Sequence, residues 1–148
     1  MEENAQIKAE TIYNLTGKNV FADDSGLFVE ALNGAPGVYS ARFAGTGNSQ
    51  DNIEKLLQEM SGFSNRKAAF RAVFCVIWNG EISFLNGKVE GEILSESKGL
   101  DGFGYDPIFV PTGYQQTFAE MNPSEKNQIS HRFHAVQKLI NFLENRPS

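Results

Sequence analysis

Apolar residues recur along the chain with two periods, and each period predicts a different kind of element. Residues 2–16 place apolar side chains three and four positions apart and end at Gly17, which predicts a helix. A second helix is predicted from Ser49, as N-cap, to Gly62. Its apolar stripe follows i, i+3, i+4 and i+7 and consists of Ile53, Leu56, Leu57 and Met60.

The C-terminal part of the chain predicts a further helical region. Asn122 suits an N-cap, Pro123 the first turn, and Glu125 the third position of a capping box. The region reaches Glu144, and its apolar stripe is Ile129, Phe133, Val136, Leu139, Ile140 and Leu143.

Runs of β-branched and aromatic residues predict several short strands between these helices. The runs are residues 19–22, 27–32, 67–78, 81–85, 88–94 and 108–110. Turn-forming residues at 23–26 separate the first two strands, and Asn79-Gly80 predicts a tight hairpin. Residues 33–47 predict a long loop. Helices and strands alternate along one domain of residues 1–148, so we expect an α/β fold.

Composition places the chain among soluble globular domains. It has 148 residues, of which 41% are apolar and 21% are charged. A chain of this size buries roughly 70% of its surface without help from a metal or disulfide, and its one cysteine, Cys75, falls in an apolar run. That run, residues 72–78, is far shorter than the roughly 20 residues of a membrane-spanning helix, so we expect no membrane partner.

Charge limits the partners further. Thirteen Lys and Arg against eighteen Asp and Glu give a net charge of −5, which argues against a broad nucleic-acid-binding face. An anionic ligand must therefore meet a local basic cluster. The first residues lack the basic and apolar segments of a secretory signal, so we expect a cytoplasmic protein.

Adjacent carboxylates, Asp23 and Asp24, form the first group that could carry chemistry. At a strand end, one of them would point into a crevice, where it could bind Mg²⁺ or orient an attacking water. The alternative interpretation is structural: one of these side chains accepts backbone hydrogen bonds and stabilises a turn.

A basic group in the C-terminal region is the second candidate. His131 follows Lys126 by five positions, which is not a helical i, i+4 spacing, so convergence with Arg132 requires a break near Ser130. A helix that begins there would offer its N–H groups to a phosphate. A solvated helix face is the alternative interpretation. His134 lacks these companions and is expected at the surface.

A glycine-rich segment with two aromatic rings is the third candidate. Phe103, Gly104, Tyr105 and Asp106 combine close backbone approach, stacking surface and a carboxylate, which suits a purine base. The segment does not match the dinucleotide fingerprint Gly-x-Gly-x-x-Gly. A tight turn with core aromatics is the alternative. Together, the three groups favour nucleotide chemistry.

The segments that carry these residues resemble the inosine/xanthosine triphosphate pyrophosphatases. The matching segments, in the order of that family, are ENA at 3–5 with Lys8, ADDSGL at 22–27, GAPGVYSAR at 34–42, GFGYDPIF at 102–109, and EK at 125–126 with ISHR at 129–132. They span nearly the whole chain. The resemblance implies a twisted mixed β-sheet flanked by helices, two lobes around a central cleft, and a homodimer.

The same resemblance implies an activity and roles for residues. The activity is Mg²⁺-dependent hydrolysis of non-standard purine nucleoside triphosphates such as ITP, dITP and XTP to the monophosphate and pyrophosphate, which cleans the nucleotide pool. Asp24 would be the catalytic carboxylate and would hold Mg²⁺ with support from Asp23. The implied substrate-binding residues are Lys8, Ser25, Phe103, Gly104, Tyr105, Asp106, Lys126, His131 and Arg132.

The chain departs from the family pattern at its start. Family members open with a strand and a phosphate-binding loop, and the sequence predicts no strand before the helix at 2–16. We therefore expect an N-terminally truncated chain that lacks this strand and loop. Two other functions stay open on these grounds, a catalytically impaired nucleotide-binding module and a pyrophosphatase for modified pyrimidine or methylated nucleotides.

Overall fold

A computed structural model describes residues 1–99 and 104–145 of the chain. In chain order its elements, with η for 3-10 helices, are α1 (Glu2–Thr16), β1 (Val20–Val29), η1 (Glu30–Leu32), η2 (Gly37–Arg42), α2 (Ser49–Met60), β2 (Lys67–Trp78), β3 (Glu81–Ile93), η3 (Asp106–Ile108), β4 (Phe109–Pro111), α3 (Pro123–Ile129) and α4 (His131–Glu144).

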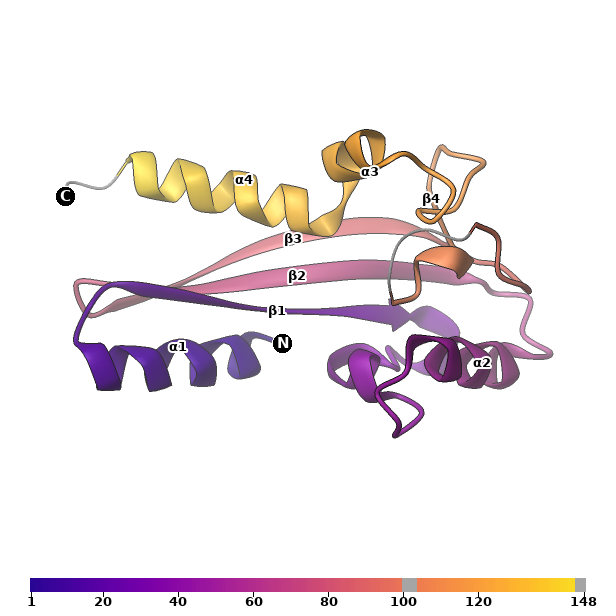
Figure 1. The fold of residues 1–148 in the computed structure, drawn as a ribbon, viewed down its shortest axis with the longest axis horizontal. Coiled ribbons are helices and arrows are strands. Elements are labelled where there is room, and N and C mark those ends of the chain that lie inside the picture. The colour runs from indigo at the N-terminus through magenta and orange to yellow at the C-terminus, as the bar shows by residue number, and fades with distance from the viewer. Residues whose placement is uncertain (100–103, 146–148) are drawn as a thin grey trace.

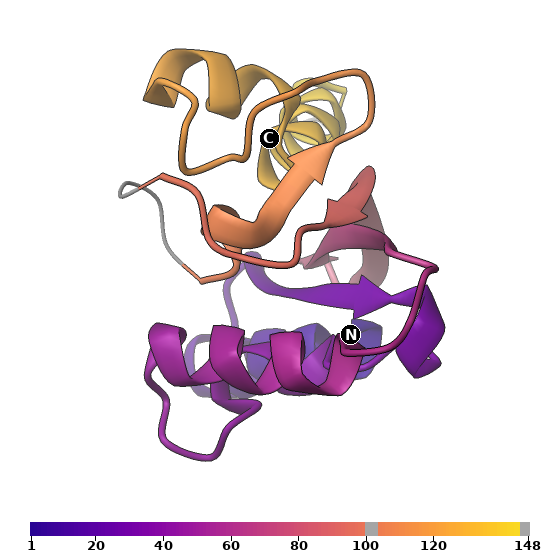
Figure 2. The same ribbon diagram turned by 90° about the vertical axis from the view of Figure 1, so that its right-hand side faces the viewer.

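The described strands form one sheet in the order β1-β2-β3-β4, and each neighbouring pair is antiparallel. Helix α4 covers one face of the sheet, and α1 and α2 lie one after the other below the opposite face (Figure 1). Figure 2 shows the same layers end-on, with α3 and α4 above the strands and α2 below them. This arrangement confirms the α/β fold. The resemblance implied a mixed sheet, whereas every pairing between described strands is antiparallel.

Strand β1 runs without a break through the residues that predicted a turn. Asp23, Asp24 and Ser25 pair in register with β2, so the prediction of two strands around a turn at 23–26 was wrong. Glycine is instead required at position 26 by a tertiary contact, because a Cβ there would collide with the carbonyl of Gly37. The acid pair consequently lies in mid-strand.

Strand β3 is likewise one strand, although a break between residues 85 and 88 was predicted. Gly87 pairs with Ala72 inside the ladder. Its missing side chain makes room for α4, since a Cβ would run into the backbone of His131 and Ala135. Glycine at this position therefore sets how closely the start of α4 packs on the sheet.

Helix ends confirm most of the local predictions. Helix α1 ends as expected at Gly17, which has the left-handed φ of 66°. The cap of α2 is Asn48 rather than Ser49, since its side chain accepts hydrogen bonds from the backbone N–H groups of Gln50 and Asp51. The C-terminal helical region breaks at Ser130 into α3 and α4.

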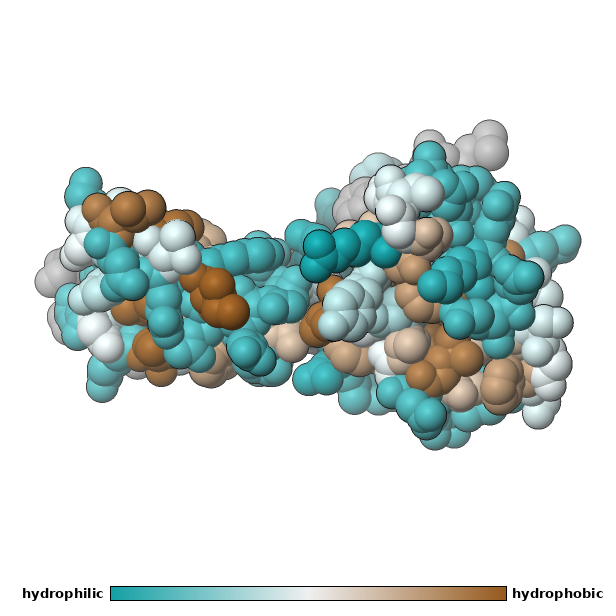
Figure 3. Space-filling model, turned by 90° about the horizontal axis from the view of Figure 1, so that it is seen from below, coloured by the Kyte–Doolittle hydropathy of each residue, from teal (hydrophilic) through white to brown (hydrophobic). Residues whose placement is uncertain are grey.

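Two clusters of buried apolar side chains hold the described fold together. One joins α1 to the sheet and contains Ala5, Ala9, Val73, Cys75 and Ile77. The other lies around α2, η3 and β4 and includes Leu27, Leu56, Phe70, Phe109 and Phe118. The molecule narrows between the α1 end and the α2 end when it is seen from below (Figure 3). Among the described helices, none has the length and hydrophobicity to cross a bilayer.

Candidate active site

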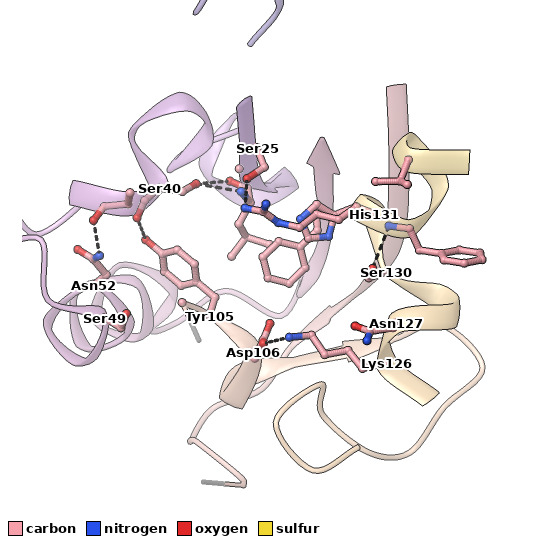
Figure 4. Close-up of a pocket in the computed structure, with 18 of the residues that line it drawn as sticks. Ser25, Ser40, Ser49, Asn52, Tyr105, Asp106, Lys126, Asn127, Ser130 and His131 are labelled. Atoms are coloured by element: carbon pink, nitrogen blue, oxygen red, sulfur yellow. Dashed lines mark hydrogen bonds and ion pairs between the residues drawn. The ribbon is translucent and has the colours of Figure 1, made fainter. Parts of the chain in front are cut away.

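A cavity of about 580 Å³ opens between β1, η2 and α2 on one side and α3 and α4 on the other. Side chains from all five elements converge on it (Figure 4). Its polar lining residues are Ser25, Ser40, Ser49, Asn52, Tyr105, Asp106, Lys126, Asn127, Ser130, His131 and Arg132.

An ion pair lies at the wall formed by η3 and α3. The Nζ of Lys126 is 2.5 Å from Oδ2 of Asp106, and the two side chains point toward each other in Figure 4. Both are largely buried, with 17% of the lysine and 6% of the aspartate side chain exposed. Because a buried charge is costly without a partner, this pairing offsets the cost of burying both groups in the wall of the cavity.

The start of α4 contributes backbone donors. Ser130 is extended, ends α3 and caps α4, and its Oγ accepts a hydrogen bond from the N–H of Phe133 at 3.1 Å. This break provides the convergence of Lys126, His131 and Arg132 that the sequence required. The first N–H groups of α4 face no carbonyl of the preceding turn, so they favour an anion.

Arg132 reaches from α4 across to β1. Its Nη2 donates to Oγ of Ser25 at 3.1 Å, and its Nη1 lies 3.7 Å from Oδ2 of Asp23. About half of the side chain is exposed, 52%, so the guanidinium can also meet a ligand from solvent. Arg132 therefore carries a positive charge to the mouth of the cavity.

His131 is stacked on Phe70, with ring centroids 4.9 Å apart and planes 12° from parallel. Burial, together with the positive charges of Arg132, Lys126 and His134, lowers the pKa of His131 to about 3. The imidazole is therefore uncharged at neutral pH. Its Nδ1 is buried and has no hydrogen-bond partner among residues 1–99 and 104–145.

Buried hydrogen bonds fix the wall opposite α4. The hydroxyl of Tyr105 donates to the carbonyl of Ser40 at 2.6 Å, and Oγ of Ser40 accepts from the N–H of Leu27 at 2.9 Å. Asn52 secures the following segment, since it donates to the carbonyl of Ala41 and accepts from the N–H of Ala44. Burial raises the pKa of Tyr105, so its hydroxyl stays protonated.

The two adjacent carboxylates point to opposite faces of β1, as strand alternation requires. Asp23 faces Arg132 on the α4 side, whereas Oδ2 of Asp24 lies 3.4 Å from the side-chain amide of Asn4 on the α1 side. Lys8 of α1 donates to the backbone carbonyl of Asp23 at 3.0 Å. The acid pair therefore presents one carboxylate to each face.

Most of the sequence-predicted site residues meet at the cavity. Those that line it are Ser25, Gly104, Tyr105, Asp106, Lys126, His131 and Arg132. Asp23, Asp24 and Lys8 lie beside it on β1 and α1. Phe103 falls in residues 100–103, outside the described residues. His134 is exposed, as expected.

Sequence reasoning missed Ser40, Asn52 and Phe70. Ser40 lies within the GAPGVYSAR segment at 34–42, so the motif contained it, but its role depends on a distant hydroxyl. Asn52 and Phe70 are ordinary residues of a helix and a strand, and no local pattern distinguishes them.

The cavity combines features that suit a purine nucleotide. It has an apolar ring surface at Phe70, paired charges at Asp106 and Lys126, and cationic and backbone donors at the start of α4. In the described part of the chain, no three His, Cys, Asp or Glu side chains come together as a ready-made metal centre. A hard cation would therefore depend on one carboxylate, with waters and ligand oxygens completing its coordination.

Comparison with known proteins agrees with this geometry. The model of the Ham1 family matches residues 1–142. A protein of Christiangramia forsetii named dITP/XTP pyrophosphatase is 49% identical over 144 residues, which cover 97% of this chain and 76% of the relative. A Porphyromonas gingivalis protein of the same name is 50% identical over 97% of this chain and 75% of its own length.

Solved structures lead to the same family. The Ham1 protein of Staphylococcus aureus superposes with a TM-score of 0.94 at 45% identity and covers 97% of this chain and 76% of that structure. A HAM1 protein from Coxiella burnetii has the same TM-score at 42% identity, over 98% and 77% of the two chains. The family model, the relatives and the solved structures therefore agree, and the chain belongs to the Ham1 family.

Proposed function

We propose that this protein hydrolyses non-standard purine nucleoside triphosphates, dITP and XTP among them, to the nucleoside monophosphate and pyrophosphate. The observation that carries the proposal is the cavity in which the Asp106–Lys126 pair and the start of α4 converge. Relatives about half identical to this chain over nearly its whole length are named dITP/XTP pyrophosphatases. Such an activity removes damaged purines from the nucleotide pool.

Recognition of the base follows from the donors in the cavity. Hypoxanthine and xanthine carry a carbonyl at position 6, where adenine carries an amino group. The ammonium of Lys126 offers donors only, so it favours a carbonyl and leaves an amino group unpaired. A site built on such polar contacts rejects the wrong base strongly.

Phosphate groups would lie toward β1 and α1. Arg132 and the first N–H groups of α4 offer positive charge on one side, and Lys8 lies beside Asp23 on the other. These groups would hold the triphosphate across the middle of β1, where Asp24 is half-buried. The Asp24 carboxylate could then orient or deprotonate the water that attacks the α-phosphate.

We further propose Mg²⁺ as cofactor, held by Asp24 and by phosphate oxygens of the substrate. The oxygen chemistry of this carboxylate suits a hard ion that keeps several waters. When bound, Mg²⁺ supplies positive charge that offsets the charge of the leaving pyrophosphate. Asp23 faces the other side of the strand and pairs with Arg132, so we assign it an orienting role rather than a shared ligand position.

A homodimer in the cytoplasm completes the proposal. Large apolar side chains are exposed along α1 and the start of β1, with Ile7 at 57%, Leu15 at 82% and Phe21 at 52%. A second copy could cover such a surface. Light scattering after size exclusion should give twice the chain mass, and a monomer at micromolar concentration would contradict the dimer. Cell fractionation tests the compartment.

Pyrophosphate release measures the activity directly. We expect turnover of dITP and XTP with Mg²⁺, little turnover without it, and little turnover of dATP. In Asp24→Asn, kcat should fall at least about 100-fold, the low end of what a positioned acid–base group contributes. Unchanged melting temperature in that variant would show that the fold is intact.

Three results would argue against parts of this proposal. Full activity of Asp24→Asn would remove the carboxylate from the mechanism. Binding of dITP without release of pyrophosphate would favour a nucleotide-binding module instead. Preference for modified pyrimidine or methylated nucleotides would assign the chain to a pyrophosphatase of a different substrate class.

A further inference from the structure

A second hollow, of about 450 Å³, lies on the far side of α4 from the first cavity. Strand β2, strand β3 and helix α4 build it, and its lining residues are Arg71, Asn86, Gly87, Lys88, His134 and Lys138. Three of its lining side chains are cationic, those of Arg71, Lys88 and Lys138, in a chain whose net charge is −5. The hollow shares none of its lining residues with the first cavity.

Most of the cationic charge around this hollow is uncompensated. Lys88 pairs with Glu90 at 2.9 Å, and the guanidinium of Arg71 lies 5.1 Å from the ring centre of Phe28. Among the described residues, no carboxylate lies within ion-pair distance of Arg71 or Lys138. Gly87 faces α4, so strand alternation directs Lys88 and its partner Arg71 toward the other face of the sheet. Lys88 and Lys138 therefore approach the β3 edge from opposite faces, and an anion at this edge would meet positive charge on both sides.

Backbone donors of β3 point into the same hollow. Strand β3 pairs with β4 only through residues 91–93, and the N–H of Thr112 donates to the outward carbonyl of Glu90. Outward-facing residues alternate along a strand edge, so Asn86 and Lys88 also direct their N–H groups outward. Among the described strands, none pairs with residues 86 and 88 on this edge, since β4 reaches only residues 91–93.

We propose that this hollow, which we call the β3-edge site, binds a small oxyanion of the phosphate class. The N–H groups of Asn86 and Lys88 would donate to its oxygens, and Lys88 and Lys138 would balance its charge. Convergent N–H groups and cations are the combination that binds phosphate in proteins. The site would operate whether or not the first cavity hydrolyses nucleotides.

Helix α4 lies between the two sites. Arg132 and Val136 line the first cavity, whereas His134 and Lys138, on the opposite side of the same helix, line the β3-edge site. Gly87 lines the β3-edge site and is also the point where the backbone of His131 rests on the sheet. An anion at the β3 edge would therefore contact the segment that supports the start of α4.

Titration of the full chain with inorganic phosphate, followed by NMR, tests the proposal. We expect saturable shifts of the Asn86 and Lys88 amide signals and of the His134 ring protons. Lys138→Gln should weaken this binding about threefold to fivefold, the effect of one exposed charge pair. Lys18→Gln removes a lysine that is also exposed, from the α1–β1 connection, and should leave the binding unchanged.

The NMR signals distinguish this site from the first cavity, because phosphate bound in the first cavity would shift the signals of Ser25 and Arg132. Arg132→Ala should leave the shifts at Asn86 and Lys88 intact. The proposal is overturned if chloride at equal ionic strength produces the same shifts, or if Lys138→Gln binds phosphate like the parent. If Lys138→Gln self-associates and phosphate has no effect on it, the lysines instead protect an open strand edge from pairing with a second chain.

Discussion

Polar side chains around the first cavity divide into those that build its walls and those that face a ligand. The side chains of Ser40 and Asn52 form hydrogen bonds with backbone groups of the 37–44 segment and of Leu27, and Tyr105 links that segment to the start of η3. Lys126, His131 and Arg132 meet the cavity from the other side. A single residue can therefore change either the shape of the cavity or its chemistry.

Tyr105→Phe should affect shape without removing the aromatic ring. The Ser40 carbonyl would lose its buried donor, so the free energy of unfolding should fall by about 1–3 kcal/mol and KM should rise. Urea unfolding measures the first effect and steady-state kinetics the second. Tyr114→Phe is the matched control, because Tyr114 is 41% exposed. Equal stability of both variants would mean that the hydroxyl has no structural role.

His131 should make stability depend on pH. In the unfolded chain its pKa is near 6.5, whereas burial lowers the folded pKa to about 3. Below pH 6.5 His131 binds a proton in the unfolded chain but not in the folded chain. The free energy of unfolding therefore falls as pH falls from 6.5 to 3. The contribution amounts to about 1.4 kcal/mol per pH unit in this window.

The variant His131→Phe keeps a ring against Phe70 but cannot titrate. Between pH 7.5 and 5, the parent should lose about 2 kcal/mol more of unfolding free energy than this variant. Urea unfolding at both pH values measures the difference. An identical loss in the two proteins would show that His131 titrates normally in the fold.

At the scale of elements, local signals predicted the helices and tertiary contacts decided the strands. The turn chemistry of Asp23 to Gly26 is strong, yet β2 offers a partner for every residue of β1 and the ladder continues. Gly26 and Gly87 predicted turns because the elements that require them, η2 and α4, are distant in sequence. Only the assembled fold shows why these two glycines are there.

The candidate site divides in the same way. Short sequence motifs identified Ser25, Asp106, Lys126 and Arg132 as site residues. The break at Ser130 followed from the spacing between Lys126 and His131. Phe70 and Asn52 contribute through packing of β2 and α2, which no local pattern encodes. The opposite orientations of the adjacent carboxylates could not be predicted while a turn was expected at 23–26.

Gly87→Ala tests how β3 positions α4. The added methyl group would push the start of α4 away from the sheet, so the free energy of unfolding should fall by about 1–3 kcal/mol. KM should rise as well, because His131 and Arg132 move with the helix. Ser83→Ala on the same strand is the control. Normal stability and kinetics in Gly87→Ala would mean that α4 can shift without consequence.

At the scale of the whole molecule, the first cavity separates two groups of elements that share few side-chain contacts. Helix α2 and η2 lie on one side with β1, α3 and α4 lie on the other, and the hydrogen bond from Arg132 to Ser25 crosses between them. A ligand in the cavity would touch both sides at once. Its binding energy should therefore add to the stability of the entire fold rather than to one element.

Inosine monophosphate, a product under the proposed function, should raise the melting temperature for this reason. At a concentration 100 times its Kd, a ligand adds about 2.7 kcal/mol, which corresponds to about 5–10 °C for a chain of this size. Differential scanning fluorimetry measures the shift. Adenosine monophosphate should produce a much smaller one, since its amino group would face the donors of Lys126. Arg132→Ala should reduce the inosine effect, because Arg132 would contact the phosphate. Equal shifts from both nucleotides would show that the cavity holds the phosphate and ribose but does not read the base.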